Sequence, residues 1–219
     1  MIALGPDLLL KALIAYALGT IMGGQLIGLL RGGIDLRRLG SGNVGATNAL
    51  RTQGKAFALG VLTIDVFKGV LAVLAVPLLV VPGLAPAPAE LSVYVCGVAV
   101  VLGHCYPVTY GFKGGKGVAT LAGVYGAVLT VALPWLLGAF VLTILLTGYA
   151  SLATLIAALV AVLYVTCFSA AGLFSLLGGF TLAMSALVAF KHRDNIRRLL
   201  RGEEHRFEKA RVLGRWLSR

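Results

Sequence analysis

The longest uncharged segment constrains this chain more than any other feature of its sequence. Residues 118–190 hold 73 consecutive positions without Asp, Glu, Lys or Arg. About 20 apolar residues cross the hydrocarbon core of a bilayer, so this segment predicts several membrane crossings. Over the whole chain, 59% of residues are hydrophobic and 12% are charged, which is too few charges to cover a solvated surface. The sequence therefore predicts an integral membrane protein and excludes a water-soluble globule.

Three further apolar runs lie before the uncharged segment, and each is long enough to cross a bilayer. They are Leu8–Leu30, Ala58–Val81 and Leu91–Val108. Within the uncharged segment, proline, glycine and small polar residues predict breaks at residues 133–135, 147–151 and 169–172. These breaks give four short spans and seven spans in total, whereas two long spans would give five in total. We favour an all-α integral membrane protein with seven transmembrane helices.

The distribution of Lys and Arg predicts which ends of the spans face the cytoplasm. Residues 31–57 carry five of them, residues 110–117 carry two and residues 191–219 carry ten, whereas residues 81–90 carry none. Cytoplasmic loops are enriched in Lys and Arg, so the first three segments are expected inside, with the N-terminus outside and the C-terminus cytoplasmic. Membrane orientation also accounts for the net charge of +11, and no nucleic-acid partner is expected.

Two ionisable residues lie inside the second predicted span. Asp65 and Lys68 are spaced i, i+3 on a helix. Ionisable residues within a span are candidates for a functional site, but a structural salt bridge is the favoured interpretation because opposite charges at this spacing satisfy each other. The three cysteines show no C-x-x-C spacing and are expected to be reduced thiols. No cluster of His, Cys and carboxylates has ligand spacing, so neither a metal site nor a cofactor is predicted.

The first polar segment with candidate chemistry is Gly40–Arg51. It combines glycines, hydroxyls, carboxamides and a guanidinium at the membrane face. Glycines let backbone N–H groups converge on an oxyanion, hydroxyls donate to it, and a guanidinium matches the geometry of a phosphate. The candidate residues are Ser41, Asn43, Thr47 and Arg51. The alternative is a flexible cytoplasmic loop with helix caps.

The second candidate is a glycine-rich turn that leads into an apolar helix. Gly114, Gly115 and Gly117 surround Lys116 there. The pattern differs from a Walker A loop, because Tyr110 and Gly117 occupy positions where that motif requires Gly and Ser or Thr. A helix N-terminus beside a lysine nevertheless favours an oxyanion. The alternative is a short turn that carries positive-inside lysines, and a nearby histidine, His104, is expected to be packed rather than catalytic.

The third candidate lies where the last span reaches the cytoplasm. His192 and Asn195 are three positions apart and are expected to share a helix face. Several arginines surround them, so the alternative is a juxtamembrane basic helix that is attracted to anionic lipid.

Taken together and in this order, the three segments resemble the acyl-phosphate:glycerol-3-phosphate acyltransferase family (PlsY) of bacterial inner membranes. The matching stretches are Gly-Ser-Gly-Asn-Val-Gly-Ala-Thr-Asn at 40–48 with Arg51, Gly-His-x-Tyr-Pro at 103–107 leading into the turn that ends at Thr120, and His-Arg-x-Asn-Ile-x-Arg-Leu-Leu at 192–200. Asp65 and Lys68 also match the family, whereas Asp194 stands where the family often has Glu. We expect a single polytopic membrane acyltransferase domain over residues 1–207, followed by a basic cytoplasmic tail over residues 208–219.

The resemblance implies a reaction and two small-molecule partners. The family transfers the acyl group of a fatty acyl phosphate to the 1-hydroxyl of glycerol 3-phosphate, which gives 1-acylglycerol 3-phosphate (lysophosphatidic acid) and phosphate. This is the first step of bacterial phospholipid synthesis, at the cytoplasmic face of the inner membrane. No cofactor or metal is implied, because an acyl phosphate is already activated.

On this basis the candidate residues receive expected roles. Catalysis and glycerol 3-phosphate binding are assigned to Ser41, Arg51, Lys116, His192 and Asn195, of which Arg51 and Lys116 hold the phosphate. Acyl-phosphate binding is assigned to Asn43, Thr47, Gly114, Gly115 and Gly117. Either His192 or the phosphate of the substrate serves as the general base.

Two other classes of protein share some of these features. A membrane transporter for a phosphorylated solute would also use basic and glycine-rich elements beside its spans. Its binding chemistry would, however, be expected near the midplane rather than at one face. A lipid-surface adaptor would use the basic tail and leave the glycine-rich segments unexplained.

Overall fold

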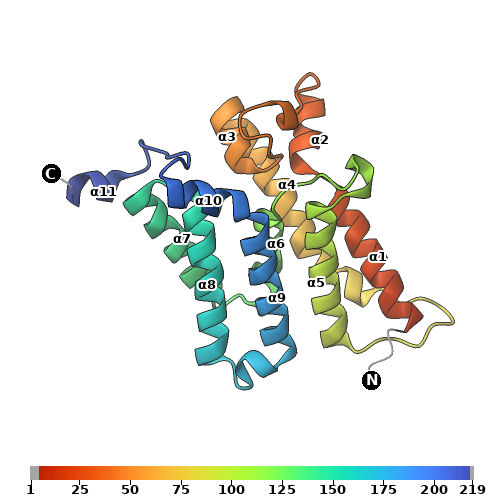
Figure 1. The fold of residues 1–219 in the computed structure, drawn as a ribbon. Helices are drawn as coiled ribbons and strands as arrows, with labels where there is room; N and C mark the ends of the chain where they lie inside the picture. Colours follow the sequence, from red (N-terminus) through yellow and green to blue (C-terminus); the bar gives the residue numbers. More distant parts are fainter. Residues whose placement is uncertain (1–4, 218–219) are drawn as a thin grey trace. The chain divides into compact units, whose positions relative to one another are not determined.

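The computed structural model describes residues 5–217, and every regular element in that range is a helix (Figure 1). The chain packs as two compact units that divide after Leu129. Three helices are long and apolar enough to cross a membrane: Lys55–Leu78, Ala89–Tyr110 and Ala150–Phe168. A bent helix pair near the N-terminus adds a fourth crossing if it counts as one span. The all-helical fold with apolar spans is therefore confirmed, while the count of seven crossings and the orientation of the termini stay predictions.

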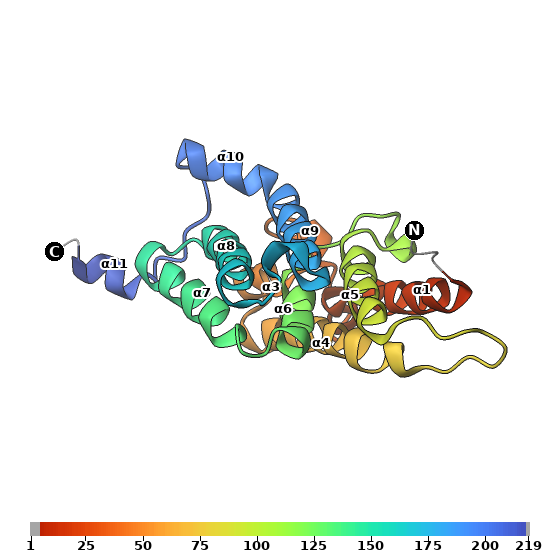
Figure 2. The same ribbon diagram turned by 90° about the horizontal axis from the view of Figure 1, so that it is seen from below.

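The first unit contains the first two candidate segments. Its elements are α1 (Pro6–Thr20), α2 (Gly23–Leu30), η1 (Leu36–Arg38), α3 (Ala46–Gln53), α4 (Lys55–Leu74), η2 (Val76–Leu78), α5 (Ala89–Cys105), η3 (Val108–Tyr110) and α6 (Val118–Val128). Helix α1 packs along α5, and α4 packs along α6 (Figure 2). Gly19 and Gly103 bring α1 and α5 into backbone contact, because a Cβ on Gly103 would meet the carbonyl oxygen of Tyr16. This close packing fixes the end of α5 from which the glycine-rich turn departs.

The predicted first span, Leu8–Leu30, consists of two helices rather than one straight helix. Helices α1 and α2 meet at a bend of 43°, where Ile21 and Met22 adopt extended backbone conformations with ψ of 100° and 112°. The carbonyl oxygens of Gly19 and Ile21 accept hydrogen bonds from Lys68 Nζ, at 3.1 and 2.7 Å. These bonds from a neighbouring helix satisfy carbonyls that the bend removes from the helical pattern.

Lys68 forms a buried ion pair with Asp65, and this pair also contacts the start of α2. Lys68 Nζ lies 2.9 Å from Asp65 Oδ1, and the N–H of Gly23 donates to the same carboxylate oxygen at 3.2 Å. Both charged side chains are at most 5% exposed. The predicted salt bridge is therefore confirmed, and it joins α4 to both sides of the bend between α1 and α2.

The predicted polar loop at residues 31–57 contains more regular structure than expected. It includes η1 and the two-turn helix α3, and α4 begins at Lys55 rather than at Ala58. Gly54 separates α3 from α4 with a φ of 85°, a conformation that glycine adopts without a steric penalty. The candidate residues Thr47 and Arg51 thus lie on a helix.

The second unit contains the third candidate segment. Its elements are α7 (Leu133–Thr147), α8 (Ala150–Phe168), η4 (Gly172–Phe174), α9 (Leu176–Lys191), α10 (Arg193–Arg201) and α11 (Val212–Leu217). Helix α8 packs between α7 and α9 (Figures 1 and 2). The helix ends agree with the predicted breaks: Gly148 ends α7 with a φ of 77°, and Ser175 Oγ accepts from the N–H of Gly178 at the start of α9. The uncharged segment therefore forms four α-helices, α6 to α9, with the short 3-10 helix η4 between the last two.

The chain after α10 folds back onto α7. Arg206 Nε donates to the carbonyl oxygen of Thr147 at 2.8 Å. The N–H of Phe207 donates to the carbonyl oxygen of Gly148 at 2.9 Å. The guanidinium of Arg206 also lies over the ring of Tyr149. Helix α11 then packs against α7. Within the described residues, the segment predicted to be a separate tail is thus anchored on the second unit.

Candidate active site

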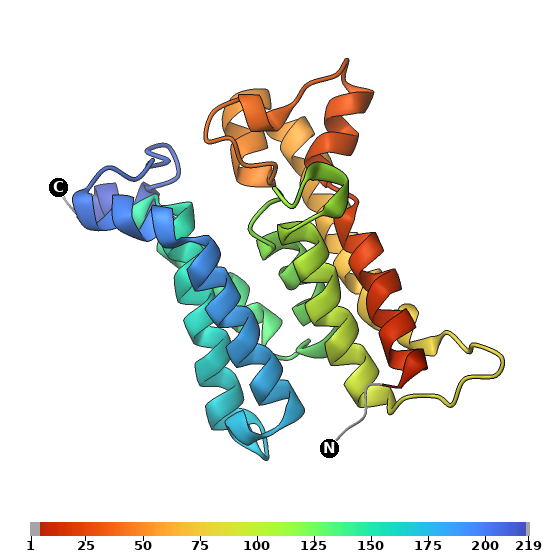
Figure 3. The same ribbon diagram turned by 45° about the vertical axis from the view of Figure 1, so that its right-hand side comes forward.

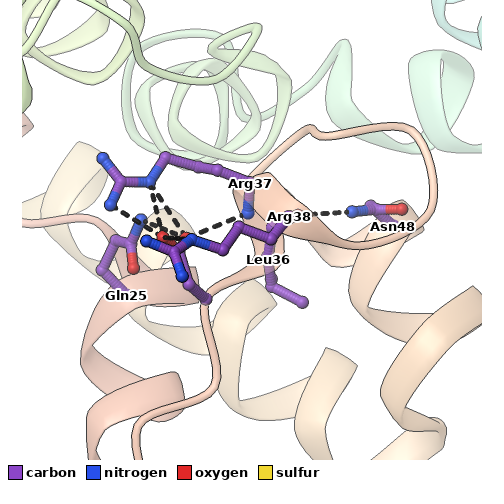
Figure 4. Close-up of polar contacts among 6 residues, drawn as sticks. Gln25, Leu36, Arg37, Arg38 and Asn48 are labelled. Atoms are coloured by element: carbon purple, nitrogen blue, oxygen red, sulfur yellow. Dashed lines mark hydrogen bonds and ion pairs between the residues drawn. The ribbon is translucent and has the colours of Figure 1, made fainter.

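The first candidate segment is organised by a buried amide, Asn48, which sequence analysis did not select as a site residue. Asn48 is 2% exposed. Its Nδ2 donates to the carbonyl oxygens of Leu36, Leu39 and Asn43 at 3.2, 2.9 and 2.8 Å, and its Oδ1 accepts from the N–H of Ser41 at 3.0 Å. Figure 4 shows the contact with Leu36. The loop before α3 is therefore wrapped around one side chain.

A second set of contacts closes the start of this loop. Asp35 accepts hydrogen bonds from Gln25 Nε2 at 3.1 Å and from Arg37 Nε and Nη2 at 2.9 and 2.8 Å (Figure 4). The hydrogen bonds from the Arg37 side chain hold the pKa of Asp35 well below its usual range, although partial burial opposes this shift. The guanidinium of Arg37 lies 5.3 Å from the ring centroid of Tyr110. This contact joins the chain that leads into the first candidate segment to the chain that leads into the second.

The candidate side chains of the first segment differ in how exposed they are. Ser41 and Thr47 are exposed, whereas Asn43 and Arg51 are half-buried. Thr47 and Arg51 are four positions apart on α3, so their side chains lie on the same helix face. Asn43 Oδ1 accepts from the N–H of Gly45 at 3.2 Å, which makes its carboxamide part of the turn before α3. The structure thus aligns a hydroxyl and a guanidinium, and gives Asn43 a role in the turn.

In the glycine-rich turn, two predicted N–H donors have partners within the protein. The N–H of Gly114 donates to the carbonyl oxygen of Cys105 at 3.3 Å. The N–H of Gly115 donates to the carbonyl oxygen of His104 at 3.1 Å. Their expected role as donors to a phosphoryl group does not hold in this conformation. Both glycines are instead required for close packing against His104. A Cβ on Gly114 would meet the carbonyl oxygen of His104, and a Cβ on Gly115 would meet its Nε2.

The other two residues of the turn lie at the beginning of α6. Gly117 precedes the helix with a φ of 79°, in the left-handed region that favours glycine. Lys116 is half-buried beside it. The first N–H groups of an α-helix have no partner within the helix and carry a partial positive charge. The turn therefore combines a lysine with a helix N-terminus, a pairing that favours anions. It lies at the same end of the first unit as α2 and α3 (Figure 3).

The third candidate segment lies in the second unit, at the junction of α9 and α10. His192 is 3% exposed, and its Nδ1 lies 2.8 Å from the carbonyl oxygen of Val188. A carbonyl oxygen only accepts hydrogen bonds, so Nδ1 carries the proton and Nε2 of the neutral ring is unprotonated. Asn195 is 6% exposed and follows on α10. The fold thus fixes the orientation of both side chains.

Glu204 supports this segment, and sequence analysis did not select it. Its Oε1 accepts from Asn195 Nδ2 at 2.6 Å and from Ser151 Oγ at 2.9 Å, and its Oε2 accepts from Arg198 Nε at 2.7 Å. Burial raises the pKa of the Glu204 carboxyl, but these hydrogen bonds outweigh burial and leave the pKa below its ordinary value. The sequence signal was weak, because two adjacent glutamates follow Gly202 and only one of them is turned inward. Within residues 5–217, no group of three or more His, Cys, Asp or Glu could hold a metal ion.

The fold and these segments define a class of protein: an integral membrane protein whose polar loops are suited to phosphate-bearing ligands. The family model for glycerol-3-phosphate acyltransferase matches residues 9–202. A glycerol-3-phosphate acyltransferase of Geobacter sulfurreducens is 41% identical over 202 residues, which cover 92% of this chain and 98% of the relative. A glycerol-3-phosphate acyltransferase of Pectobacterium carotovorum is 42% identical over 192 residues, which cover 88% of this chain and 85% of the relative.

Solved structures give the same result. Two crystal structures of PlsY (YgiH), an integral membrane glycerol 3-phosphate acyltransferase, match with TM-scores of 0.78 and 0.79 and sequence identities of 36% and 35%. Each match covers 94% of this chain and 98% of the other, and the two structures are the glycerol 3-phosphate and lysophosphatidic acid forms. The chain therefore belongs to the glycerol-3-phosphate acyltransferase family, and it is a membrane-embedded acyltransferase.

Proposed function

We propose that this chain transfers the acyl group of a fatty acyl phosphate to the 1-hydroxyl of glycerol 3-phosphate. The hydroxyl oxygen attacks the acyl carbon, the bond between that carbon and the phosphate oxygen breaks, and inorganic phosphate leaves with 1-acylglycerol 3-phosphate as the second product. One observation carries the proposal: Arg51 on α3 and Lys116 just before α6 are both half-buried cations at one end of the first unit. The relatives crystallised in glycerol 3-phosphate and lysophosphatidic acid forms support the choice of acceptor and product.

The glycerol 3-phosphate acceptor requires charge and orientation. We assign its phosphate to Arg51 and Lys116, because a guanidinium binds two phosphate oxygens at once and an ammonium adds a compact charge. Ser41, His192 and Asn195 are assigned to its hydroxyls. The hydrogen bond from Asn195 Nδ2 to Glu204 supports this role, since it orients the amide so that Oδ1 is the acceptor toward a substrate hydroxyl.

The phosphoryl group of the donor requires stabilisation as it leaves. We assign this to Gly117 and the first turn of α6, together with Thr47, because N–H groups at a helix N-terminus stabilise negative charge that develops in the transition state. Gly114 and Gly115 shape the turn, because their N–H groups bond to carbonyl oxygens of the protein. Asn43 keeps its assignment to the phosphoryl group through Nδ2, while its Oδ1 accepts within the turn before α3. Acyl phosphates are activated, so positioning supplies most of the catalysis without a covalent enzyme intermediate.

Two groups compete for the role of general base. The bond from His192 Nδ1 to the carbonyl oxygen of Val188 supports His192, because it leaves Nε2 as the basic nitrogen. The phosphate of the acceptor, with a second pKa of about 6, is the other candidate.

We also propose that the protein crosses the bacterial inner membrane seven times, with the N-terminus outside and the active site at the cytoplasmic face. The Lys and Arg residues of segments 31–57, 110–117 and 191–219 support this orientation.

The proposal is tested with protein reconstituted in lipid. Release of inorganic phosphate from palmitoyl phosphate is measured with and without glycerol 3-phosphate, beside the Lys116→Ala variant. We expect release that depends on the acceptor, yields lysophosphatidic acid and is lost in the variant. Folded protein without acceptor-dependent release would overturn the proposal, and uptake of glycerol 3-phosphate into vesicles would then test a transporter.

A further inference from the structure

A chain of buried polar contacts runs from α4 to the glycine-rich turn. Asp65, Lys68 and His104 are 1%, 4% and 3% exposed. Lys68 Nζ lies 2.9 Å from Asp65 Oδ1 and 2.8 Å from His104 Nδ1, and His104 Nδ1 lies 3.5 Å from Asp65 Oδ1. The three side chains therefore form one cluster at the C-terminal end of α5, next to the start of the turn.

Lys68 and Asp65 hold one edge of the His104 ring in place. Lys68 Nζ contacts three oxygen acceptors, namely Asp65 Oδ1 and the carbonyl oxygens of Gly19 and Ile21. These acceptors favour the ammonium form, which donates hydrogen bonds and accepts none. His104 Nδ1 lies 2.8 Å from the same nitrogen and 3.5 Å from Asp65 Oδ1, so this edge of the ring faces the ion pair.

The other edge of the same ring lies against the glycine-rich turn. A Cβ built on Gly115 would meet His104 Nε2, so the ring packs directly against the Gly115 backbone. The N–H of Gly115 also donates to the carbonyl oxygen of His104 at 3.1 Å. One residue therefore holds Gly115 by its ring and by its main chain, immediately before Lys116.

We propose that His104 is a positioning residue for the glycine-rich turn, and that its Lys68-bound ring sets the placement of Lys116 for the anionic substrate. The inference rests on the proposed function, in which Lys116 binds the phosphate of glycerol 3-phosphate. An apolar side chain of similar size would fill the same space, but it would give Lys68 no acceptor. The ring must stay in one orientation for Nε2 to remain against Gly115, and the ammonium supplies that constraint.

A double-mutant cycle tests the contact between the ring and the turn. Gly115→Ala introduces a methyl group that meets His104 Nε2, whereas His104→Ala removes the ring that supports the turn. We expect each single variant to raise the KM for glycerol 3-phosphate by about tenfold or more, because small displacements of binding groups are costly. In the double variant the methyl group occupies the space of the ring, so its KM should be well below the product of the two effects. Effects that simply multiply would overturn the proposal.

Two further variants separate positioning from general loss of packing. His104→Asn keeps an acceptor for Lys68 but lacks the atoms that reach Gly115, and it should also raise KM more than it lowers kcat. Val100→Ala is the matched control, because Val100 is fully buried on the same helix one turn earlier. It should lower thermal stability without changing KM. Equal KM values for His104→Asn and Val100→Ala would contradict the proposal.

A measurement without substrate distinguishes failure of this inference from failure of the proposed function. Hydrogen exchange of the amides at residues 114–117 should be faster in His104→Asn than in the wild type, and unchanged in Val100→Ala. If the wild type transfers no acyl group, the proposed function fails, and this measurement still decides whether His104 holds the turn. Unchanged exchange in His104→Asn would show that it does not.

Discussion

Asn195 donates a 2.6 Å hydrogen bond from Nδ2 to Oε1 of Glu204, a residue just beyond the stretch that matches the family model. The same carboxylate accepts from Ser151 on α8 and from Arg198 on α10. A single acidic side chain therefore holds a candidate catalytic amide in place and ties α10 to α8.

Replacement of Glu204 should damage both stability and activity. Glu204→Ala removes an acceptor that three side chains share, and hydrogen bonds to charged groups contribute about 1.5–3 kcal/mol each. We expect the free energy of unfolding to fall by about 2–3 kcal/mol and kcat to fall by about tenfold or more, because Asn195 loses its orientation. Thermal unfolding and initial rates in the same detergent measure both effects. The exposed neighbour gives the control: Glu203→Ala should leave both quantities unchanged, and equal losses in the two variants would contradict this role.

Asn48 should tolerate no change that removes its amide nitrogen. Asn48→Asp places carboxylate oxygens against the carbonyl oxygens of Leu39 and Asn43, which now receive a hydrogen bond from Nδ2. Loss of these bonds in a buried site costs about 1–3 kcal/mol per unsatisfied group, so we expect clear destabilisation and loss of turnover. Thr52→Val is the control, since it removes only a hydroxyl that bonds back to the carbonyl oxygen of Asn48. Wild-type activity in Asn48→Asp would show that the loop does not depend on the amide.

The ion pair at Asp35 should make stability depend on acidic pH. The pKa of Asp35 is lower in the folded protein than in the unfolded chain, where it is about 3.9. The folded state therefore binds fewer protons, and the stabilisation is fully present above about pH 4 and is lost as the pH falls through the lower folded-state value. We expect the difference in Tm between the wild type and Asp35→Asn to be constant near neutrality and to shrink at acidic pH. A difference that grows on acidification would have the wrong sign.

The identity of the general base should appear in the turnover of a histidine variant. A positioned general base contributes about 10²–10⁴-fold, so His192→Ala should lower kcat by at least about 100-fold if His192 is the base. The measurement uses saturating palmitoyl phosphate and glycerol 3-phosphate, so that weaker binding does not affect it. A variant that keeps most of its turnover would assign proton removal to the phosphate of the acceptor.

The buried pair on α4 should respond differently to single and double substitution. Lys68→Met leaves Asp65 as an unpaired buried charge, and breaking such a pair costs about 3–5 kcal/mol. Asp65→Asn combined with Lys68→Met removes both charges and should lose less stability than the single variant. Unfolding in detergent compares the two. A double variant that is less stable than Lys68→Met would show that the bond from the Gly23 N–H to the Asp65 carboxylate outweighs the cost of the buried charge.

Much of the helical framework could be predicted because its signals are local. The change from apolar to polar residues placed both ends of α5 and the start of α4 within three residues, although α4 ends at Leu74 rather than near Val81. Glycine and small polar residues marked the breaks at 147–151 and 169–172, between α7, α8 and α9. The bend after α1 gave no local signal. Its carbonyl oxygens bind Lys68, which lies 47 positions beyond Ile21 in the sequence, and an apolar run shows no trace of such a partner.

The residues of the candidate site show the same difference between local signals and contacts made by the fold. Side chains that suit a phosphate, such as Arg51 and Lys116, could be selected from their chemistry. Asn48 and Glu204 were missed because their importance comes from the backbone and side-chain groups that the fold places around them. Gly114 and Gly115 were selected for their N–H groups, whereas the feature that the structure shows for them is the close approach of His104, which lies ten and eleven positions earlier in the sequence.

The bend between α1 and α2 also bears on how the chain is assembled in the membrane. As the polypeptide is synthesised, the first apolar segment is complete before Asp65 and Lys68 have been added. Unsatisfied backbone groups are costly in the hydrocarbon core, so this segment has no stable bent form on its own. The bend therefore depends on α4, whose Asp65 and Lys68 supply the partners of its backbone groups at the end of the molecule where the polar loops form.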